Sequence, residues 1–270
     1  HFDRTLVPKI FKDAWPYALL GLLSIIMINT DVIMMGWLME AADIGLYAAA
    51  YKPIEILYVI PGILAAASFA VMARLARENQ EKMRALLEKT LAAVLLIGIP
   101  MTLGGVVLAG DIIGLVFGQE YLAATNAFRI LMLTILITFP GLVISNAIFA
   151  YNRQKSFVNF LFWGALGNVI LNFIFIPIYG ITGSAIATVG AQLVANIFIW
   201  RKMKKINPFQ TIDHLRKIFI STAIMIAPVL LLRALGVNVF LNIALSAIVY
   251  FSMLKTLKEP ILKEGFSTIG

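Results

Sequence analysis

The chain alternates between long apolar runs and short polar connections. An apolar run of about 20 residues is long enough to cross a bilayer as a helix. Because only helices and closed barrels satisfy every backbone polar group in the bilayer core, runs of this length favour helices. The pattern therefore predicts an all-α polytopic membrane protein with about eight transmembrane helices. The approximate runs are Ala14–Leu38, Ile44–Leu75, Thr90–Ala109, Leu122–Tyr151, Phe157–Ile176, Ser184–Trp200, Ile218–Leu235 and Val239–Leu257.

The basic residues orient these predicted helices. Except for Lys52, Arg129 and Arg233, every lysine and arginine lies in the N-terminal flank, in the C-terminal flank or in the second, fourth and sixth connections. The other connections contain none. Cytoplasmic loops are the ones that carry such an excess of Lys and Arg, so we predict that both termini are cytoplasmic. The mixed-charge segment 74–89 is predicted to lie as a helix on the membrane surface.

Composition supports this class and excludes several others. Of the 270 residues 61% are hydrophobic and 13% charged, which places the chain in a membrane as a multi-pass protein. The net charge of +8 follows from the basic cytoplasmic loops, so no nucleic-acid partner is expected. The chain begins at His1 rather than Met, and we expect that a further N-terminal segment precedes it.

No pattern for catalysis is found in the sequence. The chain has no cysteine, and its two histidines, His1 and His214, lie outside the apolar runs. It has no phosphate-binding loop, nucleophile elbow or metal-binding helix motif. We therefore expect neither an enzyme nor an ATP-driven machine, and we predict no cofactor and no metal site.

A few charged side chains lie inside the predicted helices, four of them at similar depth. From the helix rise, Asp31 and Arg129 are each about 10 Å below the outer surface, Lys52 about 12 Å and Glu55 about 16 Å. Charges at such depth face a bundle interior or a water-filled cavity, because exposure to lipid is costly. We therefore expect Asp31, Lys52, Glu55 and Arg129 to form one mixed-charge cluster, with Asn29 beside Asp31.

This cluster has two interpretations. In the first, Lys52 and Arg129 bind an anionic headgroup, while Asp31 or Glu55 titrates or orients them. In the second, the four charges neutralise one another as buried pairs that hold the helices together.

Amides and glycines at helical spacing predict packing contacts between helices. Asn168 and Asn172 lie four residues apart, so they share one helix face and are predicted to form interhelical hydrogen bonds. Small residues let helix backbones approach closely. The glycines predicted as close-packing sites are Gly164, Gly167, Gly183 and Gly190.

Several short segments, in order along the chain, resemble one known family, the Wzx-type oligosaccharide flippases of the polysaccharide biosynthesis proteins. Each segment alone is a weak match, but their order and spacing from residue 30 to residue 200 are similar to the family's pattern. The segments are DVIMMG at 31–36, IGLYAAA at 44–50, VFGQEYLAA at 116–124, FRIL at 128–131, GNVILN at 167–172 and IPIYGITGSAIAT at 176–188.

The resemblance implies the fold of the multidrug/oligosaccharidyl-lipid/polysaccharide exporter superfamily, in which two six-helix lobes face each other across a central cavity. Residues 1–200 resemble the second, C-terminal lobe, residues 201–217 a basic cytoplasmic linker, and residues 218–270 two additional transmembrane helices with a C-terminal tail. On this interpretation the N-terminal lobe is missing from the chain.

The function that the resemblance implies is transport of a lipid-linked oligosaccharide, a polysaccharide or O-antigen repeat unit, across the cytoplasmic membrane by alternating access. The implied partners are an undecaprenyl-linked saccharide, membrane lipids, the missing N-terminal lobe, and a polysaccharide polymerase and glycosyltransferases. Cavities of the family are basic, so the substrate-binding candidates are Arg129 and Lys52, with Asp31, Glu55 and Asn29 beside them.

Other functions remain open at this point. A cation-coupled multidrug antiporter of the same superfamily would use Asp31 or Glu55 as its ion site, and a lipid II flippase is a close variant of the leading prediction. From a different class, the chain could be a non-transporting membrane scaffold in envelope polysaccharide assembly.

Overall fold

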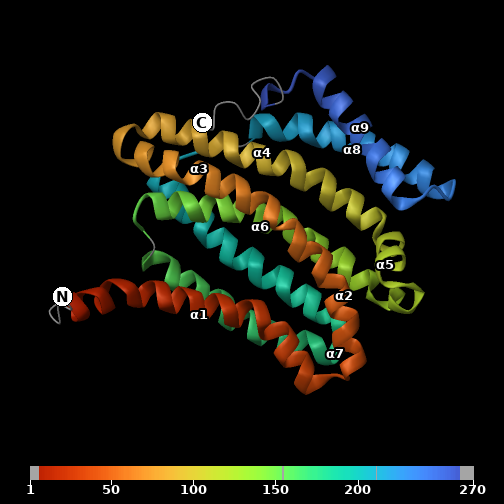
Figure 1. Cartoon of the computed structure of the whole chain (residues 1–270), viewed down its shortest axis with the longest axis horizontal. Helices are drawn as coiled ribbons and strands as arrows, with labels where there is room; N and C mark the ends of the chain where they lie inside the picture. The colour runs from red at the N-terminus through yellow and green to blue at the C-terminus, as the bar shows by residue number, and fades with distance from the viewer. Residues whose placement is uncertain (1–5, 154, 211, 262–270) are drawn as a thin grey trace.

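A computed structural model describes residues 6–153, 155–210 and 212–261 of the chain, and these residues are almost entirely helical with no strand among them (Figure 1). The elements are α1 (Leu6–Leu38), α2 (Ala41–Leu57), α3 (Val59–Glu78), α4 (Gln80–Val107), α5 (Ala109–Phe117), the 3-10 helix η1 (Gln119–Ala124), α6 (Thr125–Ala150), α7 (Lys155–Ile206), α8 (Ile212–Ala234) and α9 (Val239–Thr256).

Helices α2 and α3 together form one long span. They meet at Tyr58, close to Pro61, which has no N–H to donate to the carbonyl of residue 57. The combined stretch Ala41–Glu78 is long and apolar enough to cross a membrane. This confirms the predicted second run, Ile44–Leu75, as part of one long span.

Helix α7 contains two spans, because the chain reverses direction inside it. Gly180 has φ 58° and ψ −137°, a conformation that L side chains rarely adopt. A Cβ at Gly183 would collide with the carbonyl oxygen of Phe175, so the reversal also needs a glycine there. The two arms, residues 155–179 and 181–206, are joined across the reversal by a 3.0 Å hydrogen bond from Ser184 to Asn172.

The count of spans agrees with the prediction. Within the described residues, six helical stretches are long and apolar enough to cross a membrane, and one of these contains both long arms of α7. Separating the arms and adding α1, which holds the apolar run Ala14–Leu38, gives the eight predicted spans.

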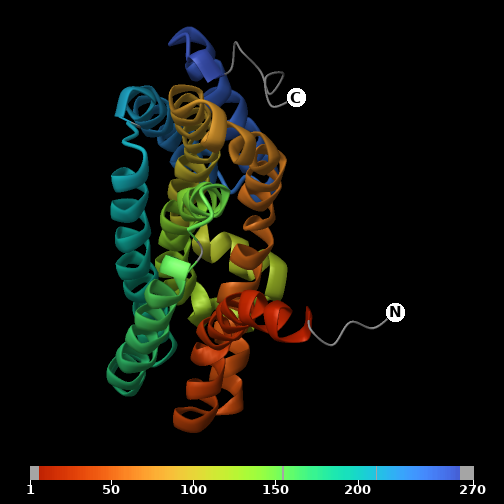
Figure 2. The same cartoon turned by 90° about the vertical axis from the view of Figure 1, so that its left-hand side faces the viewer.

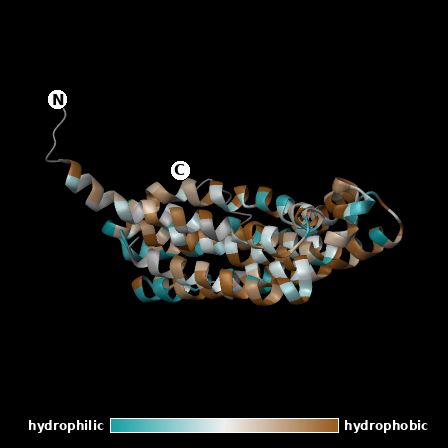
Figure 3. Ribbon diagram, turned by 90° about the horizontal axis from the view of Figure 1, so that it is seen from below, coloured by the Kyte–Doolittle hydropathy of each residue, from teal (hydrophilic) through white to brown (hydrophobic). Residues whose placement is uncertain are grey.

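Helix α6 forms the centre of the bundle. It packs against α2, α3, α4 and α7, while α1 packs on α7. Leu131, Ile135, Phe139 and Val143, along α6, are fully buried. Figure 3 shows hydrophobic residues along the helices and hydrophilic clusters at both ends, as expected when lipid rather than water surrounds the helices.

Helices α8 and α9 form a separate pair on one side of this bundle. They pack on each other, and α8 packs on α4. Tyr250 of α9 is buried and donates a 2.6 Å hydrogen bond to the carbonyl of Leu96 in α4. Arg233, at the end of α8, forms a 2.6 Å ion pair with Asp111 of α5. Helices α8 and α9 are therefore attached to the bundle through α4 and, at the end of α8, through α5.

One local prediction was wrong. Segment 74–89 does not form a surface helix, because it is divided between the end of α3 and the start of α4. Asn79 has an extended backbone, and its side chain accepts hydrogen bonds from the backbone N–H groups of Glu81 and Lys82. This N-cap starts a new helix at once, so the chain turns sharply between two long helices.

Candidate functional site

The most buried charged group in the predicted transmembrane region is the carboxylate of Asp31 on α1. Its side chain is in contact with both arms of α7 and with α2, and Asp31 is only 4% exposed. One carboxylate oxygen accepts hydrogen bonds from Asn172 (2.8 Å) and Asn168 (3.2 Å). The other accepts from Tyr47 (2.8 Å) and Thr188 (2.5 Å). We call these five residues the Asp31 centre.

The donors of the Asp31 centre are themselves held in place by further hydrogen bonds. Ser184 donates to the side-chain oxygen of Asn172, and the Asn172 amide also lies 3.0 Å from the Asn168 carbonyl. The Thr188 hydroxyl lies 3.0 Å from the Ser184 carbonyl and 3.3 Å from the Tyr47 hydroxyl. Such a connected network fixes the relative positions of α1, α2 and both arms of α7.

The local sequence explains why these groups meet. Asn168 and Asn172 are four residues apart on the first arm of α7, and Ser184 and Thr188 are four residues apart on the second, so each pair lies on one helix face. The reversal at Gly180 turns the two faces toward each other. Asp31 then lies between them, because α1 packs along α7.

The electrostatics of the Asp31 centre are unusual for a membrane interior. An ionised carboxylate has about four acceptor sites, and here four donors point at it, all of them neutral. Within the described part of the chain, no lysine or arginine forms an ion pair with Asp31. The negative charge is therefore balanced by dipoles alone.

This arrangement suits the uptake of a single small cation. A proton would neutralise the carboxylate directly, and a hard metal cation would find oxygen ligands in the carboxylate, hydroxyls and amides around it. Among the described residues there is no group of three or more His, Cys, Asp or Glu side chains that could hold a metal ion. A site built from several carboxylates therefore does not occur in this part of the chain.

The other predicted site residues lie elsewhere. Lys52 and Glu55 form a 2.8 Å ion pair with each other, and their side chains are 66% and 47% exposed. Arg129 donates a 3.0 Å hydrogen bond to Asn126 one turn before it on α6. Asn29 is exposed, and its amide donates to the carbonyl of residue 25 on its own helix.

The expectation that one cluster would unite Asp31, Lys52, Glu55 and Arg129 was therefore wrong. Only the Lys52–Glu55 pair forms, as their i, i+3 spacing allows. Depth along a helix does not fix direction around it: Lys52 lies five residues after Tyr47, roughly 140° around α2 from the side chain that contacts Asp31. Asp31 instead binds neutral donors from α2 and α7.

The predicted hydrogen-bonding face of Asn168 and Asn172 is confirmed, but the sequence did not predict which groups it would meet. Asn168 and Asn172 do form interhelical hydrogen bonds, and their acceptor is Asp31. Tyr47 and Thr188 were not expected as further donors. The signal available in the sequence was the i, i+4 spacing of Ser184 and Thr188, together with a reversal that pairs positions on either side of Gly180.

Comparison with known proteins connects this chain to one family. Residues 1–127 match the family described as "Polysaccharide biosynthesis protein". Two relatives come from Haloferax volcanii: "Probable flippase AglR", 23% identical over 85% of this chain and 50% of that protein, and "Probable low-salt glycan biosynthesis flippase Agl15", 25% identical over 58% of this chain and 34% of that protein. The chain thus spans half or less of the length of these two relatives.

Solved structures show the same fold. A structure described as "Lipid II flippase MurJ, inward closed conformation" matches with a TM-score of 0.78 at 20% identity and covers 97% of this chain and 57% of that protein. An outward-facing multidrug transporter of the exporter superfamily matches with a TM-score of 0.62 at 17% identity, covering 90% of this chain and 63% of that one. The resemblance inferred from the sequence is confirmed, and the names of these relatives and structures describe transporters rather than enzymes.

Proposed function

From its relationship to the polysaccharide-biosynthesis flippases and from the fold it shares with their exporter superfamily, we propose that this multi-pass protein of the cytoplasmic membrane supplies the C-terminal lobe of a lipid-linked oligosaccharide flippase. In this proposal residues 1–200 are the lobe, residues 201–217 a linker, and residues 218–270 two additional helices with the tail. A second lobe completes the transporter, and the two work by alternating access.

The observation that carries this proposal is the agreement between relatives and fold. Both Haloferax relatives are named as flippases, and the lipid II flippase structure covers more of the chain, at a higher TM-score, than the multidrug transporter does. The proposed substrate is an undecaprenyl-linked saccharide or a similar lipid-linked sugar. Polysaccharide polymerases and glycosyltransferases are the proposed functional partners.

In this proposal the Asp31 centre takes up a proton or a small cation, and this uptake changes how α1, α2 and α7 are held together. A carboxylate balanced only by neutral donors changes its net charge when it takes up a proton or a small cation, and its four hydrogen bonds join α1, α2 and α7. A ligand shifts a two-state equilibrium when it binds one state better than the other. Cation uptake at Asp31 would therefore bias how these helices lie relative to one another.

Lys52 and Arg129 stay the proposed contacts for the anionic headgroup, with Glu55 orienting Lys52. The Lys52–Glu55 ion pair is exposed on α2, where it is free to meet a ligand, and among the described residues Arg129 donates a hydrogen bond to the neutral amide of Asn126 and forms no ion pair. Asn29, exposed on α1 two residues before Asp31, is proposed to line the same cavity.

A second candidate function, cation-coupled multidrug antiport, is favoured by the Asp31 centre itself. A buried carboxylate without a cationic partner in the described residues is what an ion site requires, and multidrug transporters share the fold. The two candidates make different predictions about cargo, because only the flippase moves a lipid-linked saccharide.

The experiment that tests the proposed function uses the full-length protein in cells that lack it. These cells should accumulate lipid-linked saccharide on the cytoplasmic face, and the wild-type protein should restore its export. Lys52→Ala and Arg129→Ala should each lower export about tenfold, since a hydrogen bond to a charged group contributes ~1.5–3 kcal/mol. Lys82→Ala, at the cytoplasmic start of α4, is the matched control and should leave export unchanged. Restored drug efflux without saccharide export would favour the antiporter instead.

A further inference from the structure

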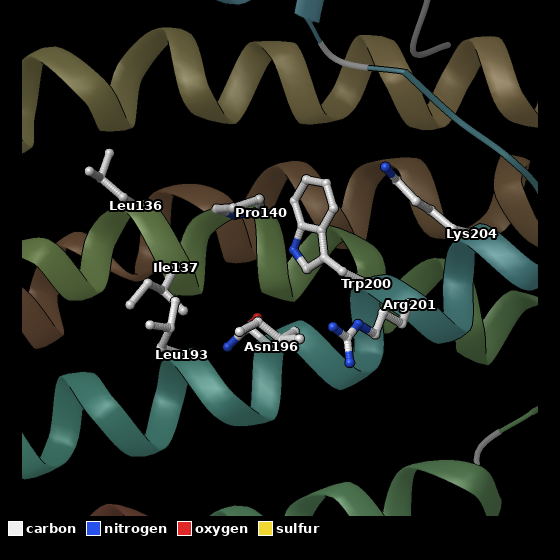
Figure 4. A pocket seen from close by; sticks show the side chains of 9 residues that line it. Leu136, Ile137, Pro140, Leu193, Asn196, Trp200, Arg201 and Lys204 are labelled. Carbon is white, nitrogen blue, oxygen red and sulfur yellow. The ribbon is translucent and has the colours of Figure 1, made fainter.

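A lipid-facing groove lies between α6 and the second arm of α7. Its volume is about 380 Å³, and its walls are mostly aliphatic and aromatic side chains (Figure 4). From the bilayer core toward the basic end of the bundle, the second arm contributes Leu193, Asn196, Ile197, Trp200, Arg201 and Lys204. The apolar part of the groove therefore lies toward the bilayer core, and the cationic part lies at the end of the groove formed by Arg201 and Lys204.

The position of the groove in the bundle indicates that it faces lipid. Figure 2 shows the second arm of α7 (teal) along one side of the bundle and α3 (orange) along the other. Beside the apolar part of the groove this arm exposes apolar side chains: Leu193 and Val194 are each 48% exposed and Ile197 41%. Apolar side chains on an outer helix face of this kind are in contact with lipid chains.

The cationic end of the groove lies where phospholipid headgroups would be. Trp200 packs against Phe209 with ring centroids 5.3 Å apart, and tryptophan is typical of the membrane interface. Arg201 and Lys204 follow on the next turn, on the groove side of the helix. From Leu193 to Lys204 the helix rises roughly 16 Å, about half of a hydrocarbon core. The groove thus reaches from headgroup level well into the acyl-chain region.

No acidic side chain among the described residues neutralises Arg201 or Lys204. Within the described part of the chain, Arg201 and Lys204 form no ion pair, and Lys204 lies over the ring of Phe209 at 5.8 Å. Both residues are exposed. Deeper in the groove, the buried side-chain oxygen of Asn196 has no hydrogen-bond partner in the structure. The groove therefore offers two unpaired positive charges above an apolar channel.

We propose that this groove binds an anionic phospholipid, whose phosphate meets Arg201 and Lys204 and whose acyl chain lies along Leu193 and Ile197. The occupant comes from the cytoplasmic leaflet, because the cations lie at the basic end of the bundle and the channel opens toward lipid. Anionic headgroups are attracted by lysines and arginines at the membrane surface. The apolar walls add the specificity for a lipid over a soluble phosphate, and the inference is independent of the proposed transport function.

The test measures phosphatidylglycerol bound to the purified chain, by native mass spectrometry and by thermal stabilisation in detergent. The double variant Arg201→Gln/Lys204→Gln should weaken phosphatidylglycerol binding about tenfold or more, given that each basic residue near the surface contributes ~1 kcal/mol. The matched control is Lys202→Gln/Lys205→Gln, which removes the same charge from the same segment but from residues that do not line the groove. It should change binding less than about twofold if the site is local.

Two further measurements distinguish a phospholipid headgroup from a soluble phosphate as the bound ligand. Ile197→Trp should fill the channel and weaken lipid binding without any change of charge, and phosphatidylcholine should bind more weakly than phosphatidylglycerol. Equal loss of binding in the two double variants would overturn the proposal in favour of general attraction to a basic surface. Competition by glycerol phosphate as strong as that by phosphatidylglycerol would also overturn it, because a soluble phosphate would then be sufficient.

Discussion

Two carboxylates in neighbouring helices are stabilised in the membrane in opposite ways. Asp31 is buried and accepts four hydrogen bonds from neutral groups, whereas Glu55 is half exposed and pairs with a single lysine on its own helix. The first joins α1, α2 and both arms of α7, and the second joins nothing beyond α2. Of these two carboxylates, the one that contacts several helices is the one with no counter-charge among the described residues.

The reason is geometric as well as electrostatic. An i, i+3 ion pair is complete within one helix turn, so it makes no demand on the neighbouring helices. A carboxylate that needs four donors must collect them from several helices, and each donor fixes one more element. Removal of the Asp31 charge is therefore expected to change relations between helices, while removal of Glu55 is expected to act locally.

The largest loss of stability should come from substitution of a glycine, Gly183, on which the arrangement around Asp31 depends, rather than from removal of either carboxylate. Gly183→Ala would push a methyl group against the Phe175 carbonyl, open the reversal in α7 and separate Ser184 from Asn172. Because overpacking against backbone cannot be relieved by a side-chain rotation, we expect destabilisation of about 3 kcal/mol, measured as thermal unfolding in detergent.

Gly167→Ala in the first arm of α7 is the matched control. A Cβ at Gly167 meets nothing within 4 Å, which also shows that the prediction of close packing at this glycine was wrong. We expect Gly167→Ala to leave the unfolding temperature unchanged or slightly higher. Equal destabilisation by both substitutions would contradict the close approach at Gly183.

A smaller effect should distinguish the two carboxylates directly. Tyr47→Phe removes one donor to Asp31 in a buried site, and we expect a loss of about 1.5 to 3 kcal/mol in the free energy of unfolding. Glu55→Gln disrupts an exposed ion pair, so its effect should stay below about 0.5 kcal/mol. If Glu55→Gln destabilised as much as Tyr47→Phe did, the contrast between the two sites would be lost.

The sequence predicted the parts of this structure that depend on one helix at a time. Apolar runs predicted the spans, and the i, i+4 spacing of Asn168 and Asn172 predicted a hydrogen-bonding face that the structure confirms. The orientation predicted from the basic loops stays a prediction. These patterns are local, so they can be recognised without knowing which helices are neighbours.

The parts that could not be predicted depend on direction around helices. The helix rise predicts similar depths for residues 31, 52 and 129, which suggested a single cluster, but the rotation of α2 turns Lys52 away from Asp31. The two separate runs predicted a turn between residues 176 and 184, and the close packing predicted at Gly183 is confirmed, but the positive φ of Gly180 that decides which faces of α7 meet could not be recognised in the sequence.

The most direct test of the central claim is export of lipid-linked saccharide by the full-length protein carrying Asp31→Asn. The variant keeps the shape of the side chain but removes its charge, and Asp43→Asn at the start of α2 is the matched control. We predict that Asp31→Asn lowers export at least tenfold, equivalent to about 1.4 kcal/mol, while the protein stays folded in the membrane, and that Asp43→Asn exports normally. Wild-type export by a folded Asp31→Asn protein would contradict the account, because the charge at Asp31 would then have no part in transport.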